Sequence, residues 1–260
     1  MFNRRTNRGS QSPSALLACT AVFSICCLAQ SGQSIRSPRP DVRSENAETG
    51  FNVAGTSQQA EEQLTSVARL LVPHKARDLY EKGRKAFRKD EYIAAKEKLG
   101  EALSLYPAFP EALTLSGYIE LRLNQKEAAE QSLRAAVRSD PTYGLAFLVL
   151  SCLYNMDHRF DDALAAARQA TTLIPNSWYA PYEMARAFAG KQEYDSALKV
   201  SVAALQSNPG TLLHVAKARA LVGLGRYSEA VTELQMFLQY HPIGDGSQYA
   251  RSLLEEIQTT

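Results

Sequence analysis

Cysteine is scarce in this chain, and its positions limit what it can do. Three of the four cysteines, Cys19, Cys26 and Cys27, lie before residue 30, which leaves Cys152 alone in the rest of the chain. No disulfide can therefore form within residues 30–260. Cys152 is expected to be a small packed side chain rather than a reactive thiol.

Groupings of catalytic or metal-binding side chains are also missing. The four histidines are scattered, and no two of them have the spacing of metal ligands. The chain has no glycine-rich phosphate loop of the P-loop or dinucleotide type. Asp161 and Asp162 are adjacent, but they fall where a helix is expected to begin, and negative charge there stabilises the helix dipole. We therefore expect no enzymatic activity, no metal and no cofactor.

Charge of one sign does not dominate the chain. Residues 1–50 hold six of the 29 Lys and Arg and three of the 27 Asp and Glu, which leaves 23 basic and 24 acidic residues for the rest. Domains that bind nucleic acid carry a basic surface. This near-neutral part of the chain is therefore not expected to bind nucleic acid.

Only one long apolar run is present, at residues 15–29. It follows Arg4, Arg5 and Arg8, and small residues, Cys27 and Ala29, end it at the −3 and −1 positions of a plausible cleavage point. This is the layout of a secretory signal peptide, and the run is short for a membrane span. We assign residues 1–29 as a signal peptide and expect an exported protein, periplasmic or secreted, with no stable membrane span after cleavage. An uncleaved signal that anchors the protein in the membrane is the alternative.

Two segments separate this run from the rest of the chain. Residues 30–60 are rich in Ser, Gln, Gly, Pro, Asn and charge, a composition that cannot bury enough apolar surface to offset its ordering entropy. They are predicted to be a disordered linker. Residues 61–75, a lead-in segment, are more apolar, and they are either a short helix docked on the first helical unit or an extended stretch ending near Pro73.

What the chain does have is a pattern that repeats. In residues 90–107, a turn precedes apolar residues at helical spacing, including Ala95, Leu99 and Leu103, and Pro107 ends the helix. Proline returns every 34 residues three times and then after 33, and alanine follows the same spacing. These residues are Pro107, Pro141, Pro175, Pro209 and Pro242, with Ala95, Ala129, Ala163, Ala197 and Ala230. A fixed period of this length is the signature of a stacked repeat protein.

The positions of the small residues resemble those of a known family. Counted from Ala76 as position 1, small residues occupy positions 8, 20 and 27 (Gly83, Ala95 and Ala102) and proline occupies position 32. In this pattern, residues 76–242 resemble the tetratricopeptide repeat family. The resemblance implies an all-α fold, a right-handed superhelical solenoid of antiparallel helix pairs behind a disordered N-terminal segment.

Five units and a capping helix account for the C-terminal three-quarters of the chain. The predicted units are residues 76–109, 110–143, 144–177, 178–210 and 211–243. Residues 244–260 follow as a helix with Ala250, Leu253 and Ile257 on one side, and Ser247 is its expected N-cap. No unit can bury its own apolar face, so such a helix is expected to cover the last one.

The family binds its partners in a concave groove lined by the first helix of each unit, roughly at positions 2, 5, 9, 12 and 13. Tyr and Arg are the residue types most enriched at binding hot spots, and this register brings many of them to the groove. The candidate protein-binding residues are Arg77, Tyr80, Arg84, Arg88, Tyr118, Arg122, Leu148, Asn155, Tyr179, Tyr182, Arg186 and Arg219. The alternative is that the tyrosines pack between adjacent first helices and that the arginines are solvated.

The sequence therefore predicts an exported scaffold that binds a peptide or protein segment, with some acidic character, in its groove. The alternative is a structural assembly subunit of a bacterial envelope or secretion complex. The partner's identity and the oligomeric state stay open at this point.

Overall fold

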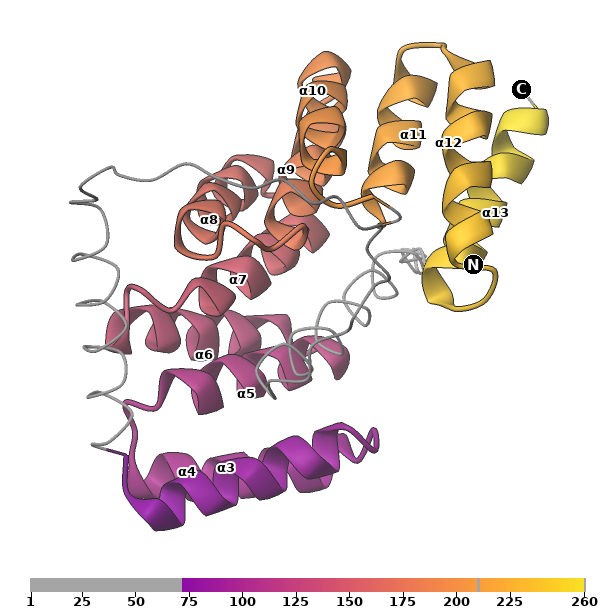
Figure 1. Cartoon of the computed structure of the whole chain (residues 1–260). Coiled ribbons are helices and arrows are strands. Elements are labelled where there is room, and N and C mark those ends of the chain that lie inside the picture. The colour runs from indigo at the N-terminus through magenta and orange to yellow at the C-terminus, as the bar shows by residue number, and fades with distance from the viewer. Residues whose placement is uncertain (1–71, 210, 260) are drawn as a thin grey trace, which may run out of the picture.

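The computed structural model describes residues 72–209 and 211–259, and this part of the chain holds eleven helices and no strand (Figure 1). Ten of the helices form five consecutive pairs, and one more follows them. The pairs are α3 (His74–Phe87) with α4 (Tyr92–Leu105), α5 (Pro110–Arg122) with α6 (Lys126–Ser139), α7 (Gly144–Met156) with α8 (Phe160–Leu173), α9 (Tyr179–Gly190) with α10 (Tyr194–Leu205), and α11 (Leu213–Gly223) with α12 (Tyr227–Tyr240); the last helix is α13 (Asp245–Gln258).

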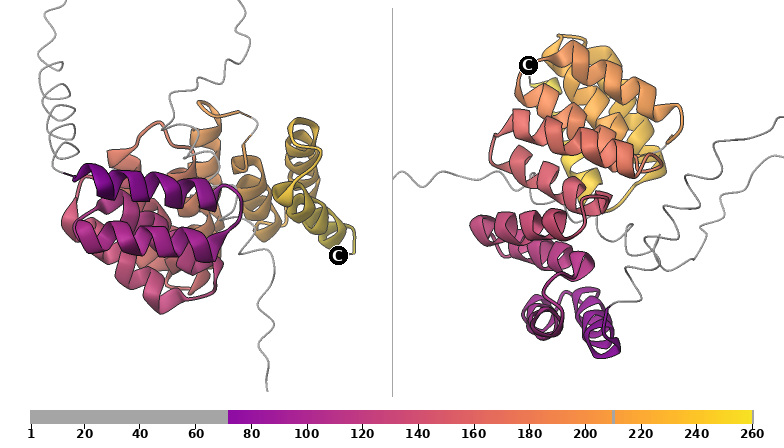
Figure 2. Two further views of the ribbon diagram at one scale, coloured as in Figure 1. Left: turned by 90° about the horizontal axis from the view of Figure 1, so that it is seen from below. Right: turned by 90° about the vertical axis from the view of Figure 1, so that its left-hand side faces the viewer.

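The pairs stack in chain order along a curved path, with α3 and α4 at one end and α13 at the other (Figures 1 and 2). We call α3, α5, α7, α9 and α11 the first helices and their partners the second helices. Each second helix packs on the first helix of its own unit and on the next helix in the chain, and each first helix also contacts the first helix of the next unit. The predicted all-α solenoid of antiparallel helix pairs is confirmed.

Small residues allow the two helices of a pair to approach closely. A Cβ added to Gly83 would lie 3.0 Å from Leu99 Cγ, and one added to Gly117 would lie 2.6 Å from Leu133 Cγ. Ala95 and Ala129, on the second helices, are fully buried at the same crossings. A larger residue at any of these four positions would push the two backbones apart.

The turn inside each pair uses the same backbone conformation five times. The fifteenth residue of every unit has a positive φ, and the next residue donates a backbone hydrogen bond to a carbonyl five residues back, which is the Schellman arrangement. The five residues are Asp90 (φ 60°), Asn124 (60°), His158 (58°), Gln192 (63°) and Gly225 (71°). Only the last is a glycine, so four units hold an ordinary side chain in the left-handed region.

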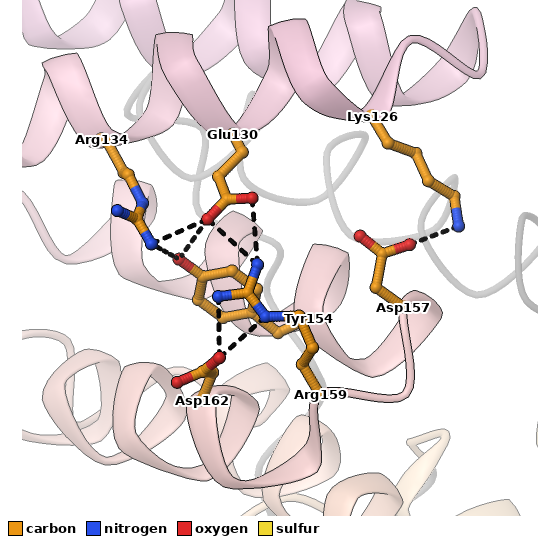
Figure 3. A network of polar contacts seen from close by, with 7 residues as sticks. All are labelled: Lys126, Glu130, Arg134, Tyr154, Asp157, Arg159 and Asp162. Atoms are coloured by element: carbon orange, nitrogen blue, oxygen red, sulfur yellow. Dashed lines mark hydrogen bonds and ion pairs between the residues drawn. The ribbon is translucent and has the colours of Figure 1, made fainter.

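Polar contacts link the second helix of one unit to the end of the next first helix. Between the second and third units, Glu130 on α6 accepts from Arg159 Nη1 (3.0 Å) and from Tyr154 Oη (3.2 Å), and the Arg159 guanidinium lies 4.3 Å from the Tyr154 ring centroid (Figure 3). Lys126 pairs with Asp157 beside this network. Such contacts fix how far one unit is rotated against the next.

The C-terminal helix covers the last pair, as its apolar pattern predicts. Ala250 and Leu253 are buried in the same core as Leu234 and Phe237. The helix begins at Asp245, two residues earlier than the expected cap, and Gly244 (φ 119°) occupies the N-cap position. The Ser247 hydroxyl instead donates to the His241 carbonyl oxygen at 2.6 Å, because Ser247 already lies inside the helix.

The predicted signal peptide (residues 1–29), the linker (30–60) and residues 61–71 of the lead-in segment (61–75) lie outside the described residues, and α3 begins within the rest of that segment, at His74. Among the helices that are described, none combines the length and the apolar character needed to cross a membrane.

Candidate protein-binding face

The first helices form one continuous layer, and we call its surface on the side away from the second helices the inner face. The sequence register places the candidate residues on this side. The structure divides them between α3, the middle helices α5 and α7, and the group α9, α11 and α13.

On α3, an aromatic and arginine-rich cluster builds the first part of the inner face. The Tyr80 ring lies 5.1 Å from the ring of Phe109, and the Arg84 guanidinium lies 5.7 Å from the centroid of Tyr80. Arg84 Nη1 also donates to Glu81 Oε1 at 2.7 Å. Arg77 is half-buried, and no described residue accepts a hydrogen bond from its Nε. Arg88, at the C-cap, is exposed.

The two candidates on α5, Tyr118 and Arg122, contact different residues. Tyr118 is buried, with its ring edge-on to Phe87 at 5.6 Å. Arg122 reaches back to the preceding unit, where its guanidinium lies 5.6 Å from the Tyr92 ring centroid and its Nη2 donates to Tyr92 Oη at 3.3 Å. Arg122 therefore sits at the junction between units.

The junction of α7 and α9 holds a buried polar group that includes one candidate. Asn155 Nδ2 donates to the backbone oxygen of Glu183 (3.0 Å) and to its Oε2 (2.7 Å). The Glu183 side chain is fully buried and accepts two further bonds from Arg186 Nη1, at 2.9 and 2.8 Å. Leu148, another of the candidates, is simply a core residue.

Helices α9, α11 and α13 together carry the second arginine and tyrosine cluster. The Arg186 guanidinium lies 5.8 Å from the Tyr182 ring centroid, and Arg219 Nη1 donates to Tyr249 Oη at 2.8 Å. Burial raises the pKa of Tyr182, the nearby Glu183 and Tyr249 raise it further, and Arg186 and Arg219 oppose them. Arg186 thus pairs with Tyr182 on α9, and Arg219 on the neighbouring helix α11 pairs with Tyr249 on α13.

Arg186 stays charged inside this cluster. Burial alone lowers the pKa of its guanidinium, but the charge and hydrogen bonds of Glu183 outweigh that effect and leave the pKa raised. Tyr179, the remaining candidate, is buried under Trp178, with the two rings stacked 3.8 Å apart.

A family model described as tetratricopeptide repeat matches residues 80–144, which run from within α3 to the start of α7. Every described helix pair has alanine at position 20 of its unit and a residue of positive φ at position 15. The chain carries tetratricopeptide repeats. No curated protein matches it in sequence.

Solved structures share the tetratricopeptide-repeat fold. TTC0263, a thermophilic TPR protein from Thermus thermophilus, is 21% identical with a TM-score of 0.61, and the match covers 71% of this chain and all of that one. PilF of Pseudomonas aeruginosa is 16% identical with a TM-score of 0.60, covering 71% of this chain and 85% of that one. YrrB, described as a TPR protein with an unusual peptide-binding site, is 17% identical with a TM-score of 0.52, covering 76% and 98%. At these identities the likeness concerns the fold.

The residue pattern alone does not single out Glu183 or Tyr249. Glu183 occupies position 6 of its repeat, which is not among the groove positions, although an acidic residue among the apolar residues of a first helix is a visible signal. Tyr249 lies on the capping helix, whose predicted role is to cover the last unit. Within the described residues, no three His, Cys, Asp or Glu side chains gather as metal ligands.

The side chains of the two clusters are suited to binding. Both combine guanidinium donors with aromatic rings, which suits carboxylates and extended peptide backbone. Of the arginines, Arg88 and Arg219 are the exposed ones, whereas Arg84 and Arg186 are mostly covered.

Proposed function

We propose that this protein is an exported scaffold that binds a segment of another protein, with acidic character, along the inner face of its tetratricopeptide repeats. The observation that carries the proposal is the second cluster: the Arg186 guanidinium lies 5.8 Å from the Tyr182 ring centroid on α9, and Arg219 on the neighbouring helix α11 donates to Tyr249 on α13. Guanidinium groups bind carboxylates bidentately, and tyrosine adds large contact area with a polar tip.

The α3 cluster supports the same kind of ligand. Arg84 and Arg88 follow Arg77 by seven and eleven residues, so the three share one side of α3 and its C-cap, and Arg84 lies over the ring of Tyr80. An acidic segment long enough to run from α3 to α13 would meet arginine at both ends of the inner face and apolar or tyrosine side chains between them. Among the solved structures of this fold, YrrB is described as having an unusual peptide-binding site.

In-cell photo-cross-linking tests the face directly. A photoreactive residue at Arg88 or Arg219, both exposed, should capture the same protein partner, and the captured peptide should contain Asp or Glu. The matched positions are Arg134 on α6 and Arg226 at the N-cap of α12, which are also exposed and should capture nothing in common with the inner positions. If Arg134 and Arg226 capture the partner and the inner positions do not, the inner face is not the binding site.

Charge reversal measures the contribution of the exposed arginines. Once the partner segment is known, Arg88→Glu and Arg219→Glu should each weaken its binding about tenfold or more, because an attraction becomes a repulsion. The control, Arg226→Glu, should change affinity less than twofold. Equal effects of all three substitutions would indicate a non-specific effect of net charge.

A structural assembly subunit is the second candidate function, and one feature favours it. Tyr240 and Ile243, near the junction of α12 and α13, are 60% and 86% exposed. Large apolar side chains grouped on a surface often mark a contact with another protein. Stable oligomers of the purified protein in light scattering, dissolved by Tyr240→Ser with Ile243→Ser, would favour assembly, whereas a monomer favours the adaptor.

Export is proposed from the pattern of residues 1–29 alone. Fusing residues 1–60 to a reporter that is active only outside the cytoplasm should give activity. Replacing Leu16 and Leu17 by charged residues should abolish that activity, because the apolar run is the recognised feature. A mature protein that begins after Ala29 indicates cleavage, and an uncut membrane-bound protein indicates an anchor.

A further inference from the structure

Charge is unevenly distributed along the solenoid. Residues 74–89, which are α3 and the turn after it, hold seven Lys and Arg against two Asp and Glu, whereas residues 90–260 hold 15 against 20. Helix α3 lies at one end of the stacked pairs (Figures 1 and 2). One end of the solenoid is therefore strongly basic, and the remainder is net acidic.

Four lysines line one side of α3 and the turn that comes after it. Lys75, Lys82, Lys85 and Lys89 recur at intervals of seven, three and four residues, so they share one side of the helix, with Asp78 as the one acid among them. All four are exposed, and none has an ion pair within the described part of the chain. Most of the Lys and Arg side chains after residue 90 do form ion pairs. We call the four lysines the lysine face.

The need for a soluble end does not account for the lysine face. A terminal repeat needs a polar outer surface. Helix α13, which covers the other end of the solenoid, has such a surface with both signs of charge, since Arg251, Glu255 and Glu256 are all exposed. Exposed charge of a single sign attracts ligands of the opposite sign. The lysine face therefore indicates an anionic partner.

The side chains of the lysine face suit a layer of anionic lipid headgroups. A lysine ammonium is a point charge on a flexible stem, whereas the planar arginine fork suits phosphates at fixed positions. Clusters of four or more basic residues on a helix are typical of binding to anionic lipid. Proteins that bind single-stranded nucleic acid also supply aromatic rings for base stacking, and none of the residues on this side of α3 is aromatic.

An exposed apolar side chain lies close to the lysine face in the sequence. Ile93 is 81% exposed, and it stands in the first turn of α4, four residues after Lys89. Helices that bind membrane surfaces combine Lys and Arg with apolar side chains that enter the boundary between headgroups and acyl chains. The turn between α3 and α4 thus offers both kinds of contact.

We propose that the lysine face and Ile93 dock this protein on a membrane surface that contains anionic lipid. The same surface repels the net acidic remainder of the solenoid, so the α3 end alone contacts the membrane. Helices α9, α11 and α13 then stay in solution, where their arginine and tyrosine cluster is accessible. The docking does not depend on what the inner face binds, so failure of one proposal leaves the other standing.

Sedimentation with lipid vesicles measures the docking. Every protein is the full-length chain with Leu16→Asp and Leu17→Asp, so that the apolar run at residues 15–29 does not itself hold the protein on the vesicle. This chain should bind vesicles of equimolar phosphatidylglycerol and phosphatidylcholine, and it should not bind vesicles of phosphatidylcholine alone. Binding to both kinds of vesicle alike, or to neither, would overturn the proposal.

Removing three lysines should weaken binding to the anionic vesicles about 100-fold, because each lysine near such a surface contributes about fivefold. The variant is Lys82→Gln with Lys85→Gln and Lys89→Gln. The matched control removes three exposed cations from three second helices, Arg138→Gln with Arg168→Gln and Lys199→Gln. It should weaken binding less than about threefold, because charges farther away than the Debye length are screened. Equal losses in the two variants would overturn the proposal. Lysine-dependent binding to duplex DNA without binding to the vesicles would also overturn it, and would assign the face to nucleic acid.

A polarity-sensitive fluorophore tests the orientation. It is attached to a single cysteine, either Ile93→Cys at the α3 end or Glu255→Cys on α13, in a full-length chain whose four native cysteines are replaced by Ser or Ala. On anionic vesicles, the emission from position 93 should shift to shorter wavelength, and the emission from position 255 should not change. A shift at both positions, at position 255 alone or at neither would contradict docking through the α3 end.

Discussion

At the scale of single residues, the turn inside each repeat requires a positive φ, and this angle destabilises a residue that has a Cβ. Gly225 has φ 71°, and a Cβ there would meet no other atom within 4 Å. Gly225→Ala is therefore expected to destabilise the protein by about 1 kcal/mol through backbone strain alone. Gly100→Ala, at an open position inside α4, should instead stabilise it by about 0.5–1 kcal/mol. Equilibrium unfolding in urea measures both, and equal effects would contradict the explanation.

Arg186 is expected to matter more for stability than an exposed arginine. Its removal leaves the fully buried carboxylate of Glu183 with Asn155 as its remaining donor. Arg186→Ala should cost about 3–5 kcal/mol, because an uncompensated buried charge is left behind. The double variant Glu183→Gln with Arg186→Ala should be more stable than Arg186→Ala alone. If it is less stable, the pair is not the source of the loss.

This expected loss affects how binding is tested. A variant of Arg186 that fails to capture a partner would be ambiguous, because the fold of α9 would change with it. Arg88 and Arg219 are exposed and avoid this difficulty. Substitutions of the exposed Arg88 and Arg219 therefore report on partner binding, whereas a substitution of the buried Arg186 also changes stability.

Glu233 gives the protein an acid-sensitive contact. Burial raises the pKa of its carboxyl, but hydrogen bonds from His214 and Lys217 outweigh burial and leave the pKa lowered. The contribution of a depressed carboxyl is complete above its unfolded pKa, about 4.3, and is lost as pH falls through the folded value. The free energy of unfolding should therefore decrease as the pH is lowered below about 5, and Glu233→Gln should make that decrease smaller. Glu229→Gln, an exposed carboxyl paired with Arg226, is the control and should reduce it less.

At the scale of helices, α13 is expected to be required as a cover. It buries Ala250 and Leu253 against the core of the last unit. Deleting residues 244–260 should expose that core and reduce solubility, because a terminal repeat without a polar outer face aggregates. Leu253→Asp should act in the same direction with the helix retained, whereas Glu255→Ser, on the exposed side, should not. A soluble, monomeric truncation in light scattering would contradict the role.

The sequence predicts these helices well because their contacts repeat. Ala95 and Ala129 lie at helix crossings where only a small residue fits. Alanine therefore recurs at a fixed spacing, and this recurrence can be read from the sequence alone. Arg122 shows the limit. Its register matches the inner face, yet the Tyr92 ring of the preceding unit holds it at the junction. The direction of the Arg122 side chain depends on a contact with the neighbouring unit, and the residue spacing within one helix gives no information about that contact.

The same reasoning applies to the candidate site. Tyr182 and Arg186 could be selected from spacing, whereas their connection to Arg219 and Tyr249 requires knowing that α9, α11 and α13 lie side by side. Glu183 cannot be selected from residue spacing. A buried carboxylate needs hydrogen-bond partners, and one of those of Glu183, Asn155, lies on another helix. The predicted residues therefore identify the face, and the structure identifies the cluster.

At the scale of the whole molecule, the apolar core divides into two clusters. One runs from α3 to α8, with Ala187 of α9, and includes Leu133. The other runs from Leu148 of α7 to α13 and includes Leu221, so the two overlap between α7 and α9. In a stacked repeat, each unit is stabilised mainly by its neighbours, so destabilisation should remain local. The buried Asn155–Glu183 contact lies where the two clusters meet.

Hydrogen exchange on two matched cavity variants tests that division. Leu221→Ala and Leu133→Ala each remove a buried leucine and should cost about 2–5 kcal/mol. Leu221→Ala should accelerate exchange in α9–α13 more than in α3–α6, and Leu133→Ala should do the reverse. If either variant accelerates exchange evenly over all described helices, the solenoid unfolds as a single cooperative unit. In that case, a partner bound at one end of the inner face would stabilise the other end equally, and the two clusters would act as one site.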